Sequence, residues 1–246
     1  MNGNRRLNGK VAIVFGGSRG IGAAAALRLA EEGADVAVTY VSAPERAAET
    51  VAAIEAAGQT GLAVNADSAD PAAIQSAVAQ TVARFGRLDV AVVNAGILLL
   101  GDVASVSVED LDRMLDVNVR GVFLAIQASA AHLQEGGRIV TIGSNTAVRS
   151  GYPGSSVYSM TKAAVAVMVK GIAVDLAGRG ITVNNIQPGP TATDMTREHL
   201  DAIKPMIPLK RAGEPDEIAG LVAYLASRES GYMTGSSLTI DGGMAL

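Results

Sequence analysis

A tyrosine and a lysine four residues apart, Tyr158 and Lys162, are the residue types in this chain best suited to proton transfer. On a helix predicted over 155–177 they share one face, so an ammonium can lie beside a phenol. A free tyrosine has a pKa of about 10, and a neighbouring cation lowers it towards neutrality. An isolated pair of this spacing is more often an ordinary solvent-facing contact. Ser144, which follows an apolar strand just upstream, favours the catalytic interpretation.

A glycine-rich turn is the second chemical feature. Gly16-x-x-x-Gly20-x-Gly22 lies between an apolar strand over 10–15 and an alanine-rich helix over 21–32. Glycine lets the backbone turn tightly and lets a pyrophosphate approach the helix N-terminus, where free N–H groups and the dipole favour an anion. A glycine triplet alone fits a tight structural turn equally well, and the strand–turn–helix context favours nucleotide binding.

Strands and helices alternate along the chain and must position these residues. The strands are continuous apolar runs, as expected where helices cover both faces of a parallel sheet. Strands are predicted over 10–15, 35–40, 61–65, 88–94, 137–143, 181–187 and 237–240. Helices are predicted over 21–32, 44–57, 71–85, 108–131, 155–177 and 216–227, with an irregular segment at 190–212. We therefore expect one α/β domain over 1–246, a Rossmann-type doubly wound parallel sheet of about seven strands with helices on both faces.

Composition excludes several classes of function. The 246 residues carry 20 Lys+Arg against 24 Asp+Glu, which gives no electrostatic reason to expect a nucleic-acid partner. The hydrophobic share of 49% excludes intrinsic disorder. Without cysteine, and with only two histidines, no metal site is expected. The polar start and the charges at Lys170 and Asp175, within the most apolar helix, predict a cytoplasmic protein without a secretory signal or membrane span.

The glycine spacing differs from the G-x-G-x-x-G of ordinary Rossmann dehydrogenases and resembles the short-chain dehydrogenase/reductase family, which includes 3-oxoacyl-carrier-protein reductases and carbonyl reductases. The other signatures of that family follow in order. They are Asn94-Ala-Gly96, Asn118, Ser144, Tyr158-Ser-Met-Thr-Lys162, Pro188-Gly189 and Thr239-Ile-Asp-Gly-Gly243. The resemblance covers essentially the whole chain.

The resemblance implies four catalytic residues. Tyr158 is then the general acid for ketone reduction, and Ser144 donates a hydrogen bond to the carbonyl oxygen. Lys162 holds the nicotinamide ribose and tunes Tyr158, while Asn118 supports a proton-relay water.

The resemblance also implies a set of cofactor-binding residues along the strand ends. Among them, Asp67 matches the position that binds adenine, and Thr191 and Thr193 match positions that hold the nicotinamide carboxamide. The full set is Gly16, Ser18, Arg19, Gly20, Ile21, Gly22, Tyr40, Ser42, Asp67, Ser68, Asn94, Ala95, Gly96, Tyr158, Lys162, Pro188, Gly189, Thr191 and Thr193.

The end of the second strand bears on the choice of cofactor. In the family an acidic residue there selects NAD, whereas this chain has Tyr40. Arg19 is a candidate partner for a 2′-phosphate, and Thr39 or Ser42 could add hydroxyl contacts. Arg19 can also be read as a solvated loop charge. We expect NADP(H).

Substrate residues are predicted at the mouth of the site. The candidates are Ile97, Asn145, Tyr152, Met195 and Met206, each of which could instead be plain core. Ser144 and Tyr158 stand one residue further apart than is commonest in the family, which indicates an enlarged loop over 145–157. The segment 190–212 is expected to be a lid that excludes water.

The predicted function is NADPH-dependent reduction of a small-molecule ketone or β-keto compound to an alcohol. An alternative is a cyclic-di-GMP-binding regulatory protein on the same fold, because the motifs at 16–24, 67–70, 93–97 and 187–190 also resemble a biofilm-dispersal subgroup. The family resemblance further implies a homotetramer, or a dimer, packed through the helices 108–131 and 155–177. Burial of their apolar faces within one subunit is an equal possibility.

Overall fold

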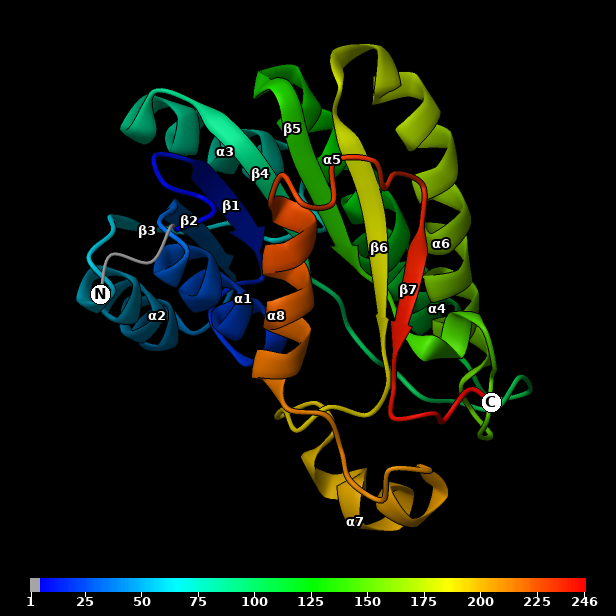
Figure 1. Cartoon of the computed structure of the whole chain (residues 1–246). Coiled ribbons are helices and arrows are strands. Elements are labelled where there is room, and N and C mark those ends of the chain that lie inside the picture. Colours follow the sequence, from blue (N-terminus) through cyan, green and yellow to red (C-terminus); the bar gives the residue numbers. More distant parts are fainter. Residues whose placement is uncertain (1–4) are drawn as a thin grey trace.

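A seven-stranded parallel sheet forms the centre of the protein (Figure 1). The computed structural model describes residues 5–246, so the first four residues of the expected single domain lie outside the described part and its extent stays a prediction. The strands are β1 (Val11–Phe15), β2 (Asp35–Tyr40), β3 (Gly61–Asn65), β4 (Leu88–Val93), β5 (Leu133–Ile142), β6 (Thr182–Pro188) and β7 (Ser237–Ile240). Their order, β3-β2-β1-β4-β5-β6-β7, confirms the predicted doubly wound α/β fold.

Helices cover both faces of the sheet (Figure 1). Residues of α1 (Gly20–Glu31), α2 (Pro44–Ala56) and α8 (Pro215–Ala226) share one core cluster. Residues of α3 (Pro71–Phe85), α5 (Gly121–His132) and α6 (Ser156–Leu176) share the other, and α4 (Val108–Leu115) packs beside α6. The sheet is thus the middle of three layers.

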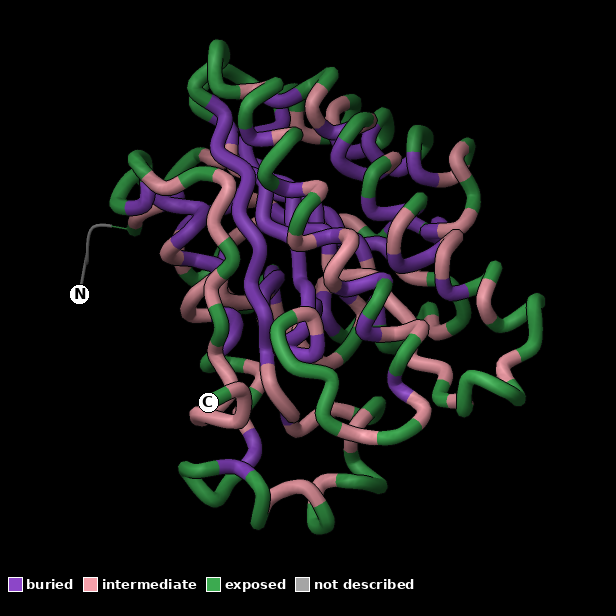
Figure 2. The backbone as a smooth tube through the Cα atoms, turned by 90° about the vertical axis from the view of Figure 1, so that its right-hand side faces the viewer, coloured by how far each residue is buried: buried purple, intermediate pink, exposed green. Residues whose placement is uncertain are grey.

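Alternate residues of each strand enter opposite cores. In β1, Ile13 and Phe15 pack with α3, α5 and α6, whereas Ala12 and Val14 pack with α1 and α8. Successive side chains of a strand point to opposite faces, so burial on both faces explains the continuous apolar runs. Figure 2 shows the consequence as buried backbone along the central strands.

Two predicted boundaries are wrong. The helix predicted over 108–131 is interrupted by a π-helical turn at Asp116–Arg120, closed by the Gly121 N–H on the Asp116 carbonyl oxygen. Glycine is needed at 121, because an added Cβ would lie 2.1 Å from the Ser68 carbonyl oxygen. The strand predicted from 137 begins at Leu133, because a register shift lets Leu133 pair with Leu88.

The segment 190–212, expected to be irregular, contains short helical turns. These are Arg197–His199, α7 (Leu200–Ile203) and Lys204–Met206. The Thr191–Gly213 bridge closes its ends. In Figure 1 the α7 region lies beyond the carboxyl ends of β6 and β7, where a lid is expected.

One helical segment, Ser156–Arg179, is long and apolar enough to cross a membrane by length and composition alone. Val165, Val169 and Ala173 of this segment are buried against the sheet. Such packing is that of a core helix, and it is what holds Tyr158 and Lys162 in place.

Candidate active site

The carboxyl ends of parallel strands meet at one edge of the sheet, and the predicted motifs meet there with them. The glycine turn follows β1, and Asn94 follows β4. Ser144 follows β5, and Gly189 follows β6. Residues far apart in sequence are therefore brought to one place by topology.

The N-terminus of α1 is left open to an anion. Its N-cap residue, Arg19, makes no side-chain capping bond, and no acidic residue lies in the first turn. By contrast, Asp70 caps α3 and Ser107 caps α4 through their side chains. The first N–H groups of α1 thus remain available, at the positive end of the helix dipole, for a ligand phosphate.

The glycines of the turn are required by close contacts. Gly20 has a φ of +53°, and a Cβ on Gly22 would lie 2.1 Å from the Gly16 carbonyl oxygen. Asn94 Nδ2 donates to that same oxygen at 2.7 Å. Thr39, expected as a possible phosphate contact, is buried, and its Oγ1 instead accepts from the Gly16 N–H at 2.9 Å. The turn is thereby fixed in a shape that leaves space for a ligand.

Lys162 is a buried ammonium with spare donors. Only 4% of the residue is exposed, and its Nζ donates to the Ile142 carbonyl oxygen at 3.0 Å. A Cβ on Gly96 would lie 3.3 Å from Nζ, so the glycine opens space in front of it. Within residues 5–246 Nζ has no other hydrogen bond, although an ammonium carries three donors. Burial lowers the pKa of Lys162 to about 8.

Tyr158 lies beside this ammonium, with Lys162 Nζ 5.6 Å from its ring centroid. Burial raises the pKa of Tyr158 to about 12; the nearby Tyr152 phenol adds to the rise, and a hydrogen bond with Ser144 opposes it. The pKa of Tyr158 therefore lies above its ordinary value, whereas a fall towards neutrality was predicted; desolvation of the phenol is the largest cause of this difference. The phenol keeps its proton at neutral pH, as a proton donor must.

Ser144 places its hydroxyl next to Tyr158, with which it forms a hydrogen bond. It caps the 3₁₀ turn Asn145–Ala147, and its Oγ accepts from the Thr146 N–H at 3.2 Å and from Thr146 Oγ1 at 2.9 Å. Since both Thr146 contacts use Ser144 as an acceptor, its own hydrogen is left to point towards the Tyr158 phenol or a substrate oxygen. Thr146 was not predicted as a site residue.

Asn118, carried by the π-helical turn, is fully buried. Its Oδ1 accepts from the Ile97 N–H and its Nδ2 donates to the Ile97 carbonyl oxygen, both at 2.9 Å. Nδ2 also donates to Thr161 Oγ1 at 3.2 Å. The side chain therefore ties the segment after β4 to α6. The support of a relay water stays a prediction. Thr161 was missed, although it directly precedes Lys162.

The remaining cofactor-side residues lie along the same edge. Asp67 accepts from Arg113 Nη2 at 3.2 Å, and Ser68 is buried. At the end of β2, Tyr40 is half-buried, while Arg19 and Ser42 are exposed. No carboxylate stands at the end of β2.

The predicted carboxamide partners follow β6. Thr191 is buried, and its Oγ1 donates to the Gly189 carbonyl oxygen at 3.0 Å. A Cβ on Gly20 would lie 3.2 Å from Thr193 Cγ2, so this segment lies over the glycine turn.

The predicted substrate residues have different surroundings. Asn145 is buried and its Nδ2 donates to Asp241 Oδ2 at 3.2 Å, so its amide holds the turn after β7. Ile97 has its backbone fixed by Asn118, and Tyr152 is half-buried near Tyr158. Their contacts with a substrate stay predictions.

On the lid, Met195 and Met206 are exposed. Ile207, also an apolar residue of this segment, is buried beneath Gly242, where an added Cβ would lie 2.7 Å from Ile207 Cγ2. It therefore anchors the lid to the turn after β7. The side chains of Met195 and Met206 are exposed to solvent, and their contact with a substrate stays a prediction.

Comparisons with known proteins agree with this geometry. The family whose description is Enoyl-(Acyl carrier protein) reductase matches residues 16–245. Versicolorin reductase 1 of Aspergillus parasiticus is 40% identical over 99% of both chains. The cyclic-di-GMP-binding biofilm dispersal mediator protein of Escherichia coli is 40% identical over 95% of this chain and 96% of its own.

A solved structure carries a ligand. A short-chain dehydrogenase from Burkholderia cenocepacia, in complex with NADP, is 48% identical and superposes with a TM-score of 0.95 over 98% of this chain and 100% of its own. Fold, strand-end motifs and near full-length matches agree. The chain belongs to the short-chain dehydrogenase/reductase family of oxidoreductases.

Proposed function

We propose that this chain is an NADPH-dependent reductase that converts a ketone, such as a 3-oxoacyl thioester or a related β-keto compound, to a secondary alcohol. One observation carries the proposal. A protonated, half-buried phenol (Tyr158) lies beside a buried ammonium (Lys162) and the hydroxyl of Ser144, at the same sheet edge as an uncapped helix N-terminus.

The residues present fit a dinucleotide. The open N–H groups of α1 suit a pyrophosphate, and the unused donors of Lys162 suit ribose hydroxyls. Thr191 and Thr193 are the proposed carboxamide contacts, and Arg19 the proposed partner of the 2′-phosphate. When bound, NADPH supplies the hydride for the carbonyl carbon.

Ser144 and Tyr158 are the proposed contacts of the substrate carbonyl oxygen. Ser144 donates a hydrogen bond that orients and polarises this oxygen, and Tyr158 gives it a proton as negative charge develops. Lys162 then lies beside a phenolate, whose charge its ammonium stabilises. Because the resting phenol holds its proton firmly, reduction is favoured at neutral pH, and oxidation of the alcohol is expected to require higher pH.

The alternative, a cyclic-di-GMP-binding regulator, draws on the 40% identity with the Escherichia coli protein. A protein that only bound cyclic-di-GMP would not need the arrangement of Ser144, Tyr158 and Lys162, and this chain has all three residues. We therefore favour the reductase.

The test is loss of NADPH absorbance with a small panel of ketones that includes an acetoacetyl ester, with NADH in parallel. Turnover with NADPH supports the proposal. Equal rates with NADH would contradict the role given to Arg19. Absence of NADPH binding, together with binding of cyclic-di-GMP, would favour the alternative.

We also propose a cytoplasmic location and self-association as a homotetramer. On α6, Val167 and Val174 are 67% and 77% exposed, and Phe123 of α5 is exposed as well. Exposed apolar side chains on these two helices favour burial against another copy. Light scattering should give a smaller mass for Val167→Lys than for wild type, while Leu209→Lys, at an exposed lid position, keeps the wild-type mass.

A further inference from the structure

A second arginine lies at the cofactor edge of the sheet. Arg46, in the first turn of α2, forms an ion pair with Asp194, which follows the proposed carboxamide residues. The other carboxylate oxygen of Asp194 accepts from Arg197 Nη2 at 3.2 Å. Arg19 also lies close enough to Asp194 to lower its pKa by charge. Three guanidinium groups thus share one carboxylate.

The position of this cluster is fixed from both sides. The segment that carries Asp194 is held by the Thr191–Gly213 bridge and lies over Gly20 of the glycine turn. Arg46 approaches from the helix that follows β2, the strand whose end would select the cofactor. The ion pair therefore spans the corner between the glycine turn, the end of β2 and the lid.

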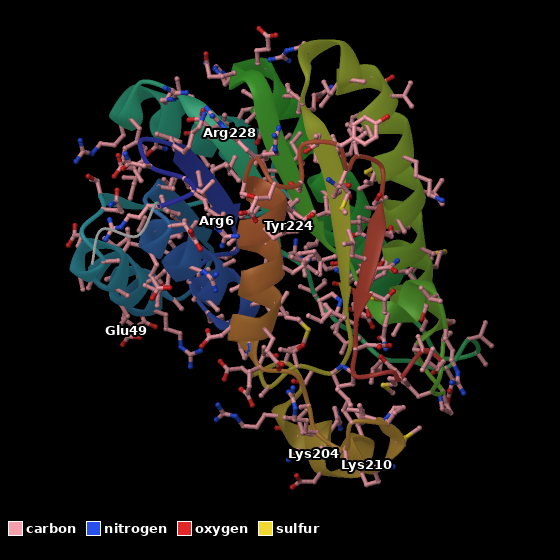
Figure 3. The ribbon with its side chains drawn as sticks, in the orientation of Figure 1. Arg6, Glu49, Lys204, Lys210, Tyr224 and Arg228 are labelled. Carbon is pink, nitrogen blue, oxygen red and sulfur yellow. The ribbon has the colours of Figure 1, made fainter. Side chains whose placement is uncertain are left out.

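Around Asp194 itself, three guanidinium groups face a single carboxylate, which leaves positive charge for an anion. Two further carboxylates, Glu45 and Glu49, act on Arg46 more weakly. Both are exposed on α2, where Figure 3 labels Glu49, and neither forms an ion pair with Arg46 among residues 5–246. A phosphate monoester carries about 1.5 to 2 negative charges near neutral pH. Guanidinium groups bind such oxygens through two parallel N–H donors.

We propose that Arg46 is a specificity-determining residue for the 2′-phosphate of NADPH, and that Asp194 holds Arg46 until this phosphate displaces it. The inference rests on the proposed function. Asp194 then lowers the affinity for NADPH, because the phosphate must compete with it. A cofactor without the phosphate gains nothing from Arg46.

Alternatively, the Arg46–Asp194 ion pair has a purely structural role and only holds the lid to α2. In that case loss of either partner loosens the lid and weakens NADPH and NADH alike. The two cases differ in the sign of the effect at Asp194 and in the dependence on the phosphate.

The experiment measures the binding of four ligands to the full chain by titration calorimetry: NADPH, NADH, 2′,5′-ADP and 5′-AMP. The variants are Arg46→Gln and Asp194→Asn. The matched control is Lys204→Gln, which removes an exposed lid ion pair (Lys204–Asp201, 2.9 Å) away from this corner; Figure 3 labels Lys204 beside α7.

We expect Arg46→Gln to bind NADPH and 2′,5′-ADP about tenfold more weakly and the other two ligands within about twofold of wild type. Asp194→Asn should bind NADPH about two- to fivefold more tightly, and both effects should shrink as salt is added. Lys204→Gln should match wild type.

Four outcomes would overturn the inference. If both variants bind NADPH and NADH equally more weakly than wild type does, the Arg46–Asp194 ion pair has only a structural role. If Arg46→Gln binds NADPH as wild type does, Arg46 does not contact the 2′-phosphate. Binding of all four ligands without preference for the phosphate refutes this inference but leaves nicotinamide binding intact. Failure to bind any of them refutes the proposed function as well.

Discussion

Replacement of Asn118 by alanine should damage both the fold and the site. The side chain makes three hydrogen bonds, two with the backbone of Ile97 and one with Thr161. In Asn118→Ala the Ile97 N–H and carbonyl groups lose their partners, next to a newly made void. Since Ile97 is only half-buried, water can satisfy part of this loss.

The expected cost follows from those contacts. Each unmatched buried polar group costs about 1–3 kcal/mol, and with water reaching Ile97 we take the lower end, about 2–3 kcal/mol in total. For a chain of this size, about 1 kcal/mol shifts Tm by roughly 2–4 °C, so the Tm of Asn118→Ala should fall by about 4–12 °C. Turnover should fall about 100-fold, because the Ile97 segment beside Lys162 loses its fixed position.

The assay is a thermal melt by circular dichroism, paired with NADPH turnover well below the Tm of the variant. Thr161→Val is the matched control, because it removes one partner of Asn118 and leaves both Ile97 contacts, so its Tm should fall by only about 2–4 °C. If Asn118→Ala keeps the wild-type Tm and turnover, the anchoring role assigned to Asn118 is wrong.

Two further predictions concern the glycine turn and the buried lysine. Gly22→Ala puts a carbon 2.1 Å from the Gly16 carbonyl oxygen, so calorimetry should show NADPH binding lost, whereas Gly171→Ala, in open space on α6, should bind as wild type does. Burial lowers the pKa of Lys162 to about 8, below the value of about 10.4 in the unfolded chain, so the unfolded state binds more protons between those values. The free energy of unfolding of wild type, relative to Lys162→Met, should therefore rise between pH of about 8 and 10 in urea titrations, and a fall would contradict the burial argument.

Much of the site could be predicted from the sequence because it stands at strand ends. Apolar strands followed by Gly16, Asn94, Ser144 and Gly189 need only the parallel topology to bring these residues together. The Tyr158–Lys162 pair needs only helical spacing.

Other features depend on contacts that no local pattern records. The π-helical turn under Asn118 follows from the close approach of Gly121 to the Ser68 backbone, which is remote in sequence. The raised pKa of Tyr158 depends on how deeply the fold buries the phenol, and residue types alone gave the opposite direction. The pairing of Arg46 with Asp194 joins positions 148 residues apart.

The most direct test of the central claim separates binding from proton donation. In Tyr158→Phe the phenol hydroxyl is removed, while Lys162, Ser144 and the α1 N-terminus remain. We predict NADPH affinity within about threefold of wild type, measured by calorimetry, and ketone turnover reduced about 10²- to 10⁴-fold, as expected for loss of a general acid. Turnover near the wild-type rate, with NADPH still bound, would contradict the assignment of Tyr158 as the proton donor.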